Sequence, residues 1–215
     1  MIISIDGPAA SGKSTTAKKL ANRLNYLHLD TGAMYRAVTL YFYNNKVDLS
    51  SNTDVKRNLK QVSITFDDNE EIHLNGLNVA TDIRRDEINR NVSKVSAIFE
   101  VREKMVELQR VIGDGKNVVV EGRDIGTRVF PNADYKFYII ADVIERGRRR
   151  FKELEFNGEK VQLVNVIEDL RKRDQYDSTR EHSPLTKAED AIEVDTTYLS
   201  IDEQVNKIIT IINDN

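Results

Sequence analysis

Residues 7–14, GPAASGKS, combine two glycines with a lysine and a serine at a spacing suited to nucleotide phosphates. They follow a short apolar run that ends at Ile5, and a stretch with the apolar spacing of an amphipathic helix comes after them. Glycines let a loop bring backbone N–H groups close to an anion, and a helix N-terminus adds partial positive charge. Lys13 would reach the outer phosphates, and the Ser14 hydroxyl would bind Mg²⁺. The pattern therefore predicts a phosphate-binding loop, or P-loop.

The P-loop predicts only that a nucleoside triphosphate binds, for which we take ATP, and it leaves open what receives a phosphate. The predicted ATP-binding residues are Gly7, Pro8, Ala9, Ala10, Ser11, Gly12, Lys13, Ser14 and Thr15. GTPases, ATPases and small-molecule kinases all use such a loop. Residues 45–48, NKVD, match a guanine-reading motif, but they trail an early helical pattern and no D-x-x-G motif accompanies them. The end of a helix explains residues 45–48 better.

Composition limits the classes of partner. The chain has 215 residues, of which 31% are charged and 40% hydrophobic, and its net charge is -3. This charge, without a basic tail, gives little support for a nucleic-acid partner. The absence of Cys excludes disulfides and fits a reducing compartment, and His28, His73 and His182 lack metal-ligand spacing. No stretch approaches the roughly 18–20 apolar residues of a membrane span. We expect a cytoplasmic protein with no membrane or nucleic-acid partner.

The elements that must position the P-loop follow an alternating pattern. Further buried strands are predicted from short apolar runs at residues 26–30, 117–121, 135–141 and 191–195. Helical spacing follows the P-loop, with Ala17, Leu20, Ala21 and Leu24 apolar, and recurs at residues 33–44, 99–112 and 201–212. Runs of this kind, interleaved with helices, predict an α/β fold with a five-stranded parallel sheet flanked by helices.

Two segments depart from this rhythm. Residues 62–80 alternate apolar and polar side chains and contain Asn75-Gly76, a strong hairpin signal, so they predict a small antiparallel β insertion. Residues 146–180 are rich in arginine and in acids, which by itself is typical of a solvated helical face.

Four ordered blocks together resemble the bacterial cytidylate kinases, a family of nucleoside monophosphate kinases. They are the P-loop, LDTGAMYRAV, EGRDIGTRVFP and RKRDQYDSTREHSPL. The resemblance implies transfer of the γ-phosphoryl group of ATP to CMP or dCMP with Mg²⁺, by a monomer. It also implies one P-loop kinase domain over residues 1–215. That domain would have a core (residues 1–35, 99–145 and 181–215), a monophosphate-binding region with the β insertion (residues 36–98) and a helical lid (residues 146–180).

The resemblance also assigns roles to residues. The implied CMP-binding residues are Asp30, Thr31, Tyr35, Arg36, Ser93, Arg102, Arg123, Asp124, Arg173, Asp177 and Arg180. The implied catalytic residues are Lys13, Arg123, Arg146, Arg149 and Arg150. Arg36 and Arg123 would hold the acceptor phosphate, since two guanidinium groups suit a dianion brought up against a polyanion. Asp124 would accept a hydrogen bond from the N4 amino group of cytosine, which uracil lacks.

Plainer interpretations stand beside these roles. Ser93 and Arg102 could belong to ordinary amphipathic helices, and Arg173 with Asp177 could form an i, i+4 ion pair on a helix surface. Two other functions remain open: another small P-loop kinase, with UMP, AMP or shikimate as acceptor, and a P-loop NTPase or regulatory module. Acceptor preference separates the first from a CMP kinase, and ATP turnover without any acceptor identifies the second.

Overall fold

A computed structural model describes residues 1–67, 69–156 and 158–214 of the chain. The chain divides into two compact units, the first formed by Met1–His28 and Gly115–Asn215 and the second by Leu29–Asp114. Among the described residues, no helix combines the length and the apolar character needed to cross a bilayer.

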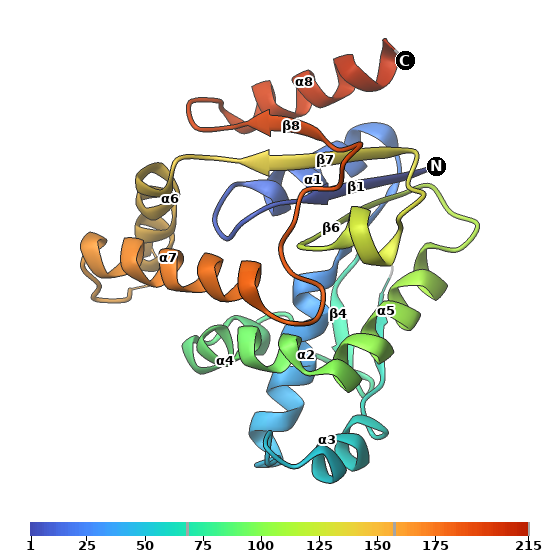
Figure 1. Ribbon diagram of the computed structural model, residues 1–215, viewed down its shortest axis with the longest axis vertical. Coiled ribbons are helices and arrows are strands. Elements are labelled where there is room, and N and C mark those ends of the chain that lie inside the picture. Colours follow the sequence, from blue (N-terminus) through green and yellow to red (C-terminus); the bar gives the residue numbers. More distant parts are fainter. Residues whose placement is uncertain (68, 157, 215) are drawn as a thin grey trace. The chain divides into compact units, whose positions relative to one another are not determined.

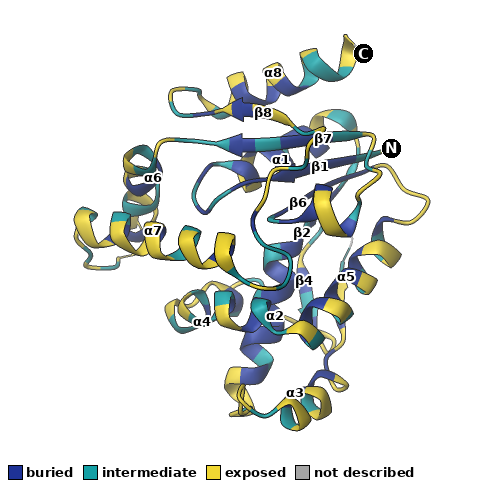
Figure 2. Cartoon of the chain, viewed as in Figure 1, coloured by how far each residue is buried: buried dark blue, intermediate teal, exposed yellow. Residues whose placement is uncertain are grey.

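A five-stranded parallel sheet in the order β2-β6-β1-β7-β8 confirms the predicted fold class (Figure 1). Its strands are β1 (Ile2–Asp6), β2 (Leu27–Asp30), β6 (Val118–Gly122), β7 (Tyr135–Ile140) and β8 (Ile192–Asp195). The central strands are buried along almost their whole length (Figure 2), which is why they read as continuous apolar runs. At its carboxyl end, β1 places Asp6 opposite Gly122 of β6 and Tyr138 of β7.

The helices of the first unit are α1 (Lys13–Leu24), α6 (Val143–Phe156), α7 (Leu163–Thr179) and α8 (Ile201–Asn213), with a short π-helical turn, η2 (Ile125–Val129). Buried side chains from α1 and α8, among them Leu20 and Ile208, pack with Ile3, Ile5 and Phe137 of the strands in one core. Removing that apolar surface from water, at about 25 cal/mol per Å², is what holds the helices on the sheet.

Helices α6 and α7 lie side by side (Figure 1). Gly147 of α6 allows this approach, because a Cβ there would lie only 2.3 Å from Cγ1 of Ile167 on α7. The arginine-rich segment that the sequence singled out therefore forms a helical pair.

The second unit is built around α2 (Thr31–Asn44). Its other elements are α3 (Asn52–Leu59), β3 (Ile64–Phe66), β4 (Ile72–Leu74), β5 (Leu77–Asn78), η1 (Asp82–Arg84), α4 (Asp86–Ala97) and α5 (Phe99–Gly113). Met34, Val38 and Phe42 of α2 are buried, and α2 contacts α4, α5, η1 and β4. The second unit therefore has a helical core of its own.

The predicted β insertion is confirmed as a three-stranded antiparallel sheet in the order β3-β4-β5. Asn75 and Gly76 connect β4 to β5 with φ values of 51° and 81°, the positive values that this two-residue turn requires.

The predicted helix and strand ends shift by one or two residues. The helix predicted at residues 33–44 begins at Thr31, because the Asp30 side chain accepts a hydrogen bond from the backbone N–H of Ala33 and so caps the helix N-terminus. The same helix ends at Asn44, and Lys46 has a φ of 50°. Residues 45–48 are thus the C-cap of a helix and the turn after it, in agreement with the sequence interpretation.

Candidate functional site

The P-loop, residues 7–14, joins the end of β1 to the start of α1. Gly7 has a φ of +154°, and a Cβ there would lie 2.2 Å from the backbone oxygen of Ile139. Gly12 precedes α1 with a φ of +92°, a value that side chains other than glycine rarely adopt. The buried Ser11 hydroxyl has no hydrogen-bond partner among the described residues. The loop is therefore tightly wound and retains a donor for an added oxygen atom.

Cationic side chains converge on the backbone of the P-loop. Lys13 is buried, and its Nζ donates to the backbone oxygen of Pro8 at 3.1 Å. Arg146 of α6 is also buried, and its Nη1 donates to the backbone oxygen of Ala9 at 3.0 Å and to Asp174 Oδ2 at 2.6 Å. Asp174 of α7 in turn accepts from the backbone N–H of Ala9 at 3.4 Å. The helical pair α6–α7 therefore contacts the P-loop through an arginine and a carboxylate.

The other two arginines predicted for the lid, Arg149 and Arg150, have different partners. Arg149 donates from Nη1 to the backbone oxygen of Ser11 at 3.3 Å and from Nη2 to that of Thr196 at 2.6 Å, so it links the P-loop to the segment after β8. Arg150 forms an ion pair at 2.9 Å with Glu153 on its own helix. Of these two arginines, only Arg149 is brought to the P-loop by the contacts described.

A buried carboxylate, Glu121 of β6, lies beneath the start of α1. The Ser14 hydroxyl donates to Glu121 Oε2 at 2.5 Å, and His28 Nε2 lies 3.3 Å from Oε1. Burial raises the pKa of Glu121, but the hydrogen bond from His28 and the positive charge of Lys13 outweigh burial and bring the pKa below its ordinary value. Glu121 is therefore held as an anion next to Ser14.

The oxygen donors at this point suit Mg²⁺. Magnesium takes hard oxygen ligands, and it is commonly bound by one or two protein side chains together with substrate phosphates. The Ser14 hydroxyl and the Glu121 carboxylate supply oxygens of this kind. Within the described ranges, no group of three or more His, Cys, Asp or Glu side chains is placed to hold a metal ion.

Residues 122–126, which we call the GRDIG loop, follow Glu121 and lead into η2. Arg123 donates from Nε to Asp177 Oδ2 of α7 at 3.1 Å and from Nη1 to the backbone oxygen of Gly122 at 3.3 Å. Asp124 is 3% exposed, and its Oδ1 lies 4.0 Å from Arg180 Nη2. The loop therefore presents one guanidinium and one carboxylate, and each of them faces an opposite charge.

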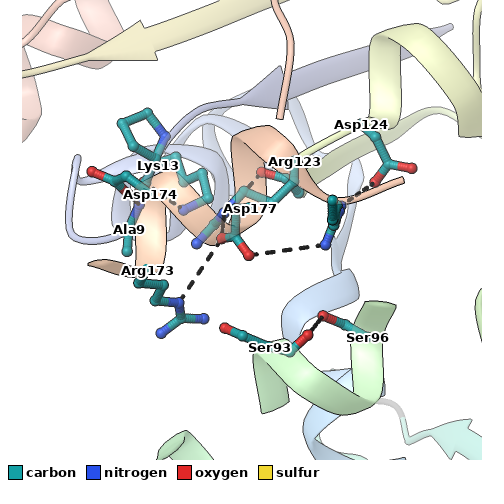
Figure 3. A network of polar contacts seen from close by, with 12 residues as sticks. Ala9, Lys13, Ser93, Ser96, Arg123, Asp124, Arg173, Asp174 and Asp177 are labelled. Carbon is teal, nitrogen blue, oxygen red and sulfur yellow. Dashed lines mark hydrogen bonds and ion pairs between the residues drawn. The ribbon is translucent and has the colours of Figure 1, made fainter. Parts of the chain in front are cut away.

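Asp177 is the centre of a charge cluster (Figure 3). Besides Arg123, it faces Arg173, whose Nε lies 4.0 Å from Oδ2, and Arg180, whose Nη1 lies 3.9 Å from Oδ1. Asp177 is 3% exposed. The i, i+4 ion pair between Arg173 and Asp177 is present, and the same carboxylate also holds the GRDIG loop. Three arginines thus surround one buried carboxylate.

A second buried carboxylate, Asp6, lies under the GRDIG loop. Its Oδ1 accepts from the backbone N–H of Ile125 at 2.9 Å, and its Oδ2 accepts from that of Gly126 at 2.8 Å. Burial raises the pKa of Asp6 to about 7, although the two backbone donors act in the opposite direction.

In the second unit, two predicted residues lie at the start of α2. Thr31 is the first residue of the helix and is buried, and Asp30 caps it. One turn later, Arg36 donates from Nε to Asn89 Oδ1 of α4 at 3.2 Å. A Cβ at position 32 would lie 3.0 Å from Nη1 of Arg36 and 3.1 Å from Oδ1 of Asp30, so Gly32 leaves room for both side chains.

The remaining residues predicted for the second unit, Tyr35, Ser93 and Arg102, are linked by contacts around Arg102. Arg102 of α5 is 3% exposed, and its guanidinium carbon lies 5.4 Å from the ring centroid of Tyr35, a cation–π contact. Its Nη1 donates to the backbone oxygen of Ser96 at 3.1 Å, and the Ser96 hydroxyl donates to the backbone oxygen of Ser93 at 3.1 Å. Arg102 thus lies on the buried face of α5, together with Val101 and Met105.

The sequence interpretation missed Asp6, Glu121 and Asp174 as parts of the site. Each had a signal: Asp6 and Glu121 end apolar strands directly before functional blocks, and Asp174 adjoins Arg173. A carboxylate that ends a buried apolar strand in a P-loop protein is a candidate partner of the magnesium site. That rule would have selected Glu121, together with Asp6, Asp30 and Asp195 at the ends of other strands.

Comparison with known proteins defines the class and then the family. A parallel sheet whose first strand leads into GPAASGKS and a helix defines a P-loop nucleotide-binding protein. Residues 3–214 match the family model of cytidylate kinase. The chain therefore belongs to the cytidylate kinase family.

Two curated relatives and one solved structure illustrate the likeness. A cytidylate kinase of Fusobacterium nucleatum is 46% identical over 97% of this chain and 95% of its own length. A cytidylate kinase of Cytophaga hutchinsonii is 47% identical over 98% of this chain and 92% of its own length. The crystal structure of TT1252 from Thermus thermophilus has a TM-score of 0.50 at 15% identity, covering 100% of this chain and 96% of that chain. This last likeness concerns the fold alone.

Proposed function

We propose that this protein transfers the γ-phosphoryl group of ATP to CMP or dCMP, giving ADP and CDP or dCDP. The observation that carries the proposal is that β1 and β6 are adjacent parallel strands. β1 ends in the P-loop and β6 ends in the GRDIG loop, with Asp6 and Gly122 in register. Ligands of α/β proteins bind at the carboxyl ends of the strands. A donor phosphate and an acceptor phosphate would therefore meet above two adjacent strands.

The chemistry needs no side chain as nucleophile or general base. The attacking atom is a phosphate oxygen of the nucleoside monophosphate, which is already deprotonated near neutral pH. It forms a bond to the γ-phosphorus in line with the bond to the β-phosphate oxygen, which breaks and leaves with ADP. The task of the protein is to position the two nucleotides and to stabilise charge on the transferring oxygens.

Lysine and arginine side chains would supply that charge. Lys13, Arg146 and Arg149 donate to P-loop carbonyls in the structure, so they are within reach of phosphates that enter the loop. Each of them would exchange a carbonyl oxygen for a phosphate oxygen, a stronger acceptor. We assign Arg150 to the same group as a residue that must first leave Glu153.

Magnesium belongs to the proposal as the metal bound with ATP. The Ser14 hydroxyl would help to hold Mg²⁺, which would supply positive charge for the phosphates of ATP. Glu121 accepts the Ser14 proton in a hydrogen bond, which turns a lone pair of the hydroxyl oxygen outward. Glu121 is thus proposed as a residue that orients Ser14.

For the acceptor, we propose that Arg36 and Arg123 bind the phosphate and that Asp124 accepts from the cytosine N4 amino group. Ser93 and Arg102 would complete contacts to the base. Arg173, Asp177 and Arg180 would serve the sugar and the neighbouring phosphate, joined by Asp30, Thr31 and Tyr35. Arg123 is paired with Asp177 in the structure, so phosphate binding would draw one of its nitrogens from that carboxylate.

We further propose the division of labour within one P-loop kinase domain. Residues 36–98 would bind the monophosphate and residues 146–180 would close as a lid over the core. Closure excludes water, which would otherwise compete as acceptor and waste ATP. We propose a monomer as the working form.

An initial-rate assay tests the proposal. Release of ADP from Mg-ATP is measured with CMP, dCMP, UMP, AMP and shikimate, each against a blank without acceptor. We expect release that depends on CMP or dCMP, with the other acceptors far behind. Strong dependence on UMP, AMP or shikimate would assign a different small-molecule kinase. Equal release with and without acceptor would identify an NTPase or regulatory module.

A further inference from the structure

Asp6 lies where the two phosphate-handling loops meet. It is the last residue of β1, and its backbone continues directly into Gly7 of the P-loop. Its neighbours across the sheet are Gly122, the first residue of the GRDIG loop, and Tyr138 of β7. The Asp6 side chain is almost fully buried, with the residue 5% exposed. A charged group in such a place needs a specific partner.

The partners of Asp6 are two successive backbone donors. The N–H of Ile125 and the N–H of Gly126 point at separate carboxylate oxygens, at 2.9 and 2.8 Å. These residues directly follow Asp124 and open the η2 turn. A carboxylate at the start of a helical turn also benefits from the partial positive charge of the free N–H groups. Asp6 therefore fixes the chain immediately beyond Arg123 and Asp124.

Gly126 independently indicates that this part of the loop is docked closely on the sheet. A Cβ at position 126 would lie 3.1 Å from Oγ of Ser4, 3.2 Å from Cδ of Lys136 and 3.5 Å from Oδ2 of Asp6. Ser4 and Asp6 belong to β1, and Lys136 belongs to β7. The absence of a side chain at position 126 lets the backbone come within hydrogen-bond range of Asp6.

We propose that Asp6 is the positioning residue of the acceptor site, which sets Arg123 and Asp124 relative to the P-loop. The inference rests on the proposed function, since it gives the acceptor roles to Arg123 and Asp124. Asp6 touches neither nucleotide in this scheme. Because it is continuous with Gly7 and bonded to the GRDIG loop, it fixes the spacing between the donor phosphates and the acceptor phosphate. Transfer depends steeply on that spacing.

The test replaces Asp6 with asparagine, which keeps the shape of the side chain. The amide oxygen can accept from one backbone N–H, but the NH₂ group then faces the other donor. We expect about a tenfold rise in KM for CMP and a comparable loss of preference for CMP over UMP, while KM for ATP stays within about twofold. Amide hydrogen exchange at Ile125 and Gly126 should accelerate in the same variant.

A control is available at the other end of β1. The Asp134 carboxylate also accepts a backbone N–H, from Ile2 at 2.6 Å, at the start of the strand that ends in Asp6. Asp134→Asn therefore makes the same chemical change next to the same strand, away from the GRDIG loop. We expect unchanged KM values for CMP and ATP.

Gly126→Ala gives a second route if Asp6→Asn folds poorly. The added methyl group pushes the loop from Ser4 and Lys136 and leaves Asp6 in place. The same selective rise in KM for CMP is expected. Equal losses for ATP and CMP in both variants, or an unchanged KM for CMP, would overturn the positioning role. Release of ADP by the unmodified protein without any acceptor would instead overturn the proposed function.

Discussion

Two carboxylates lie at the carboxyl ends of neighbouring strands of the same sheet, and their surroundings shift their pKa values in opposite directions. Glu121 of β6 pairs with Ile5 of β1, and Asp6 is one residue further along β1, opposite Gly122. Both carboxylates are almost fully buried. The pKa of Glu121 is nevertheless lowered, whereas the pKa of Asp6 is raised to about 7.

The difference lies in the neighbours and not in the depth of burial. Burial raises both pKa values, but Glu121 faces His28 and the positive charge of Lys13. Asp6 is stabilised by two neutral backbone N–H groups and lies near the negative charge of Asp124. Glu121 is thus held as an anion, whereas Asp6 is a carboxylate that titrates near neutrality.

The largest effect is expected from removal of Lys13, the cation that helps to lower the pKa of Glu121. Lys13→Ala should lower the turnover number by about 10²- to 10³-fold, because a charge on the transferring oxygens is lost. It should also raise the pKa of Glu121, making Glu121 more like Asp6. Turnover is measured with saturating CMP and ATP, and folding is followed by circular dichroism and thermal unfolding.

Lys19→Ala is the control for Lys13→Ala. Lys19 lies on the same helix, is 42% exposed at its side chain and pairs with Asp202 at 2.7 Å. The turnover number of the Lys19→Ala variant should equal that of the unmodified protein. A loss of folded structure in Lys13→Ala that matches the loss of turnover would mean that Lys13 is a structural residue.

The pH dependence of stability gives the next effect. Asp6 binds its proton more tightly in the folded protein, with a pKa of about 7, than in the unfolded chain, where its pKa has the ordinary value of 3.8. Its contribution to stability is therefore fully present below pH 3.8 and is lost as pH rises towards 7. Relative to Asp6→Asn, the free energy of unfolding should fall by about 2 kcal/mol between about pH 5 and pH 7. Urea unfolding of both proteins measures it, and parallel pH profiles would contradict the raised pKa.

A smaller effect is expected at Asp124, a residue of the proposed acceptor site. Asp124→Asn should lower the preference for CMP over UMP, as a ratio of kcat/KM values, by about tenfold, because an amide no longer repels the uracil carbonyl. KM for ATP should change less. Thr127→Ala, at an exposed position of η2, serves as the control. An unchanged CMP to UMP ratio in Asp124→Asn would defeat the assignment.

The smallest effect concerns the partner of Glu121. His28→Gln should lower the free energy of unfolding by about 1 kcal/mol, the usual net worth of a buried hydrogen bond. His73 is the matched control, since its Nε2 lies 3.2 Å from Asp67 Oδ2 in a more exposed pair. His73→Gln should cost less, about 0.5 kcal/mol or below. Equal costs in urea unfolding would remove burial as the distinction between the two pairs.

Local patterns account for what the sequence could predict. The P-loop and the strands are short segments, and the glycines and apolar residues that determine their structure lie within them. The sequence therefore predicted these elements directly. Asp6 could not be read in this way, because its partner Ile125 is 119 residues away. His28 likewise meets Glu121 across 93 residues. Spacing did foresee the pair of Arg173 and Asp177, but not that Asp177 also holds Arg123 from another part of the chain.

Gly147 bears on how the proposed lid would move. Because no side chain at position 147 separates α6 from Ile167, α6 and α7 pack closely and would rotate together. A rotation that takes Arg146 away from the P-loop would therefore also take away Asp174, its ion-pair partner. The charge removed from the loop would then be smaller than if α6 moved alone.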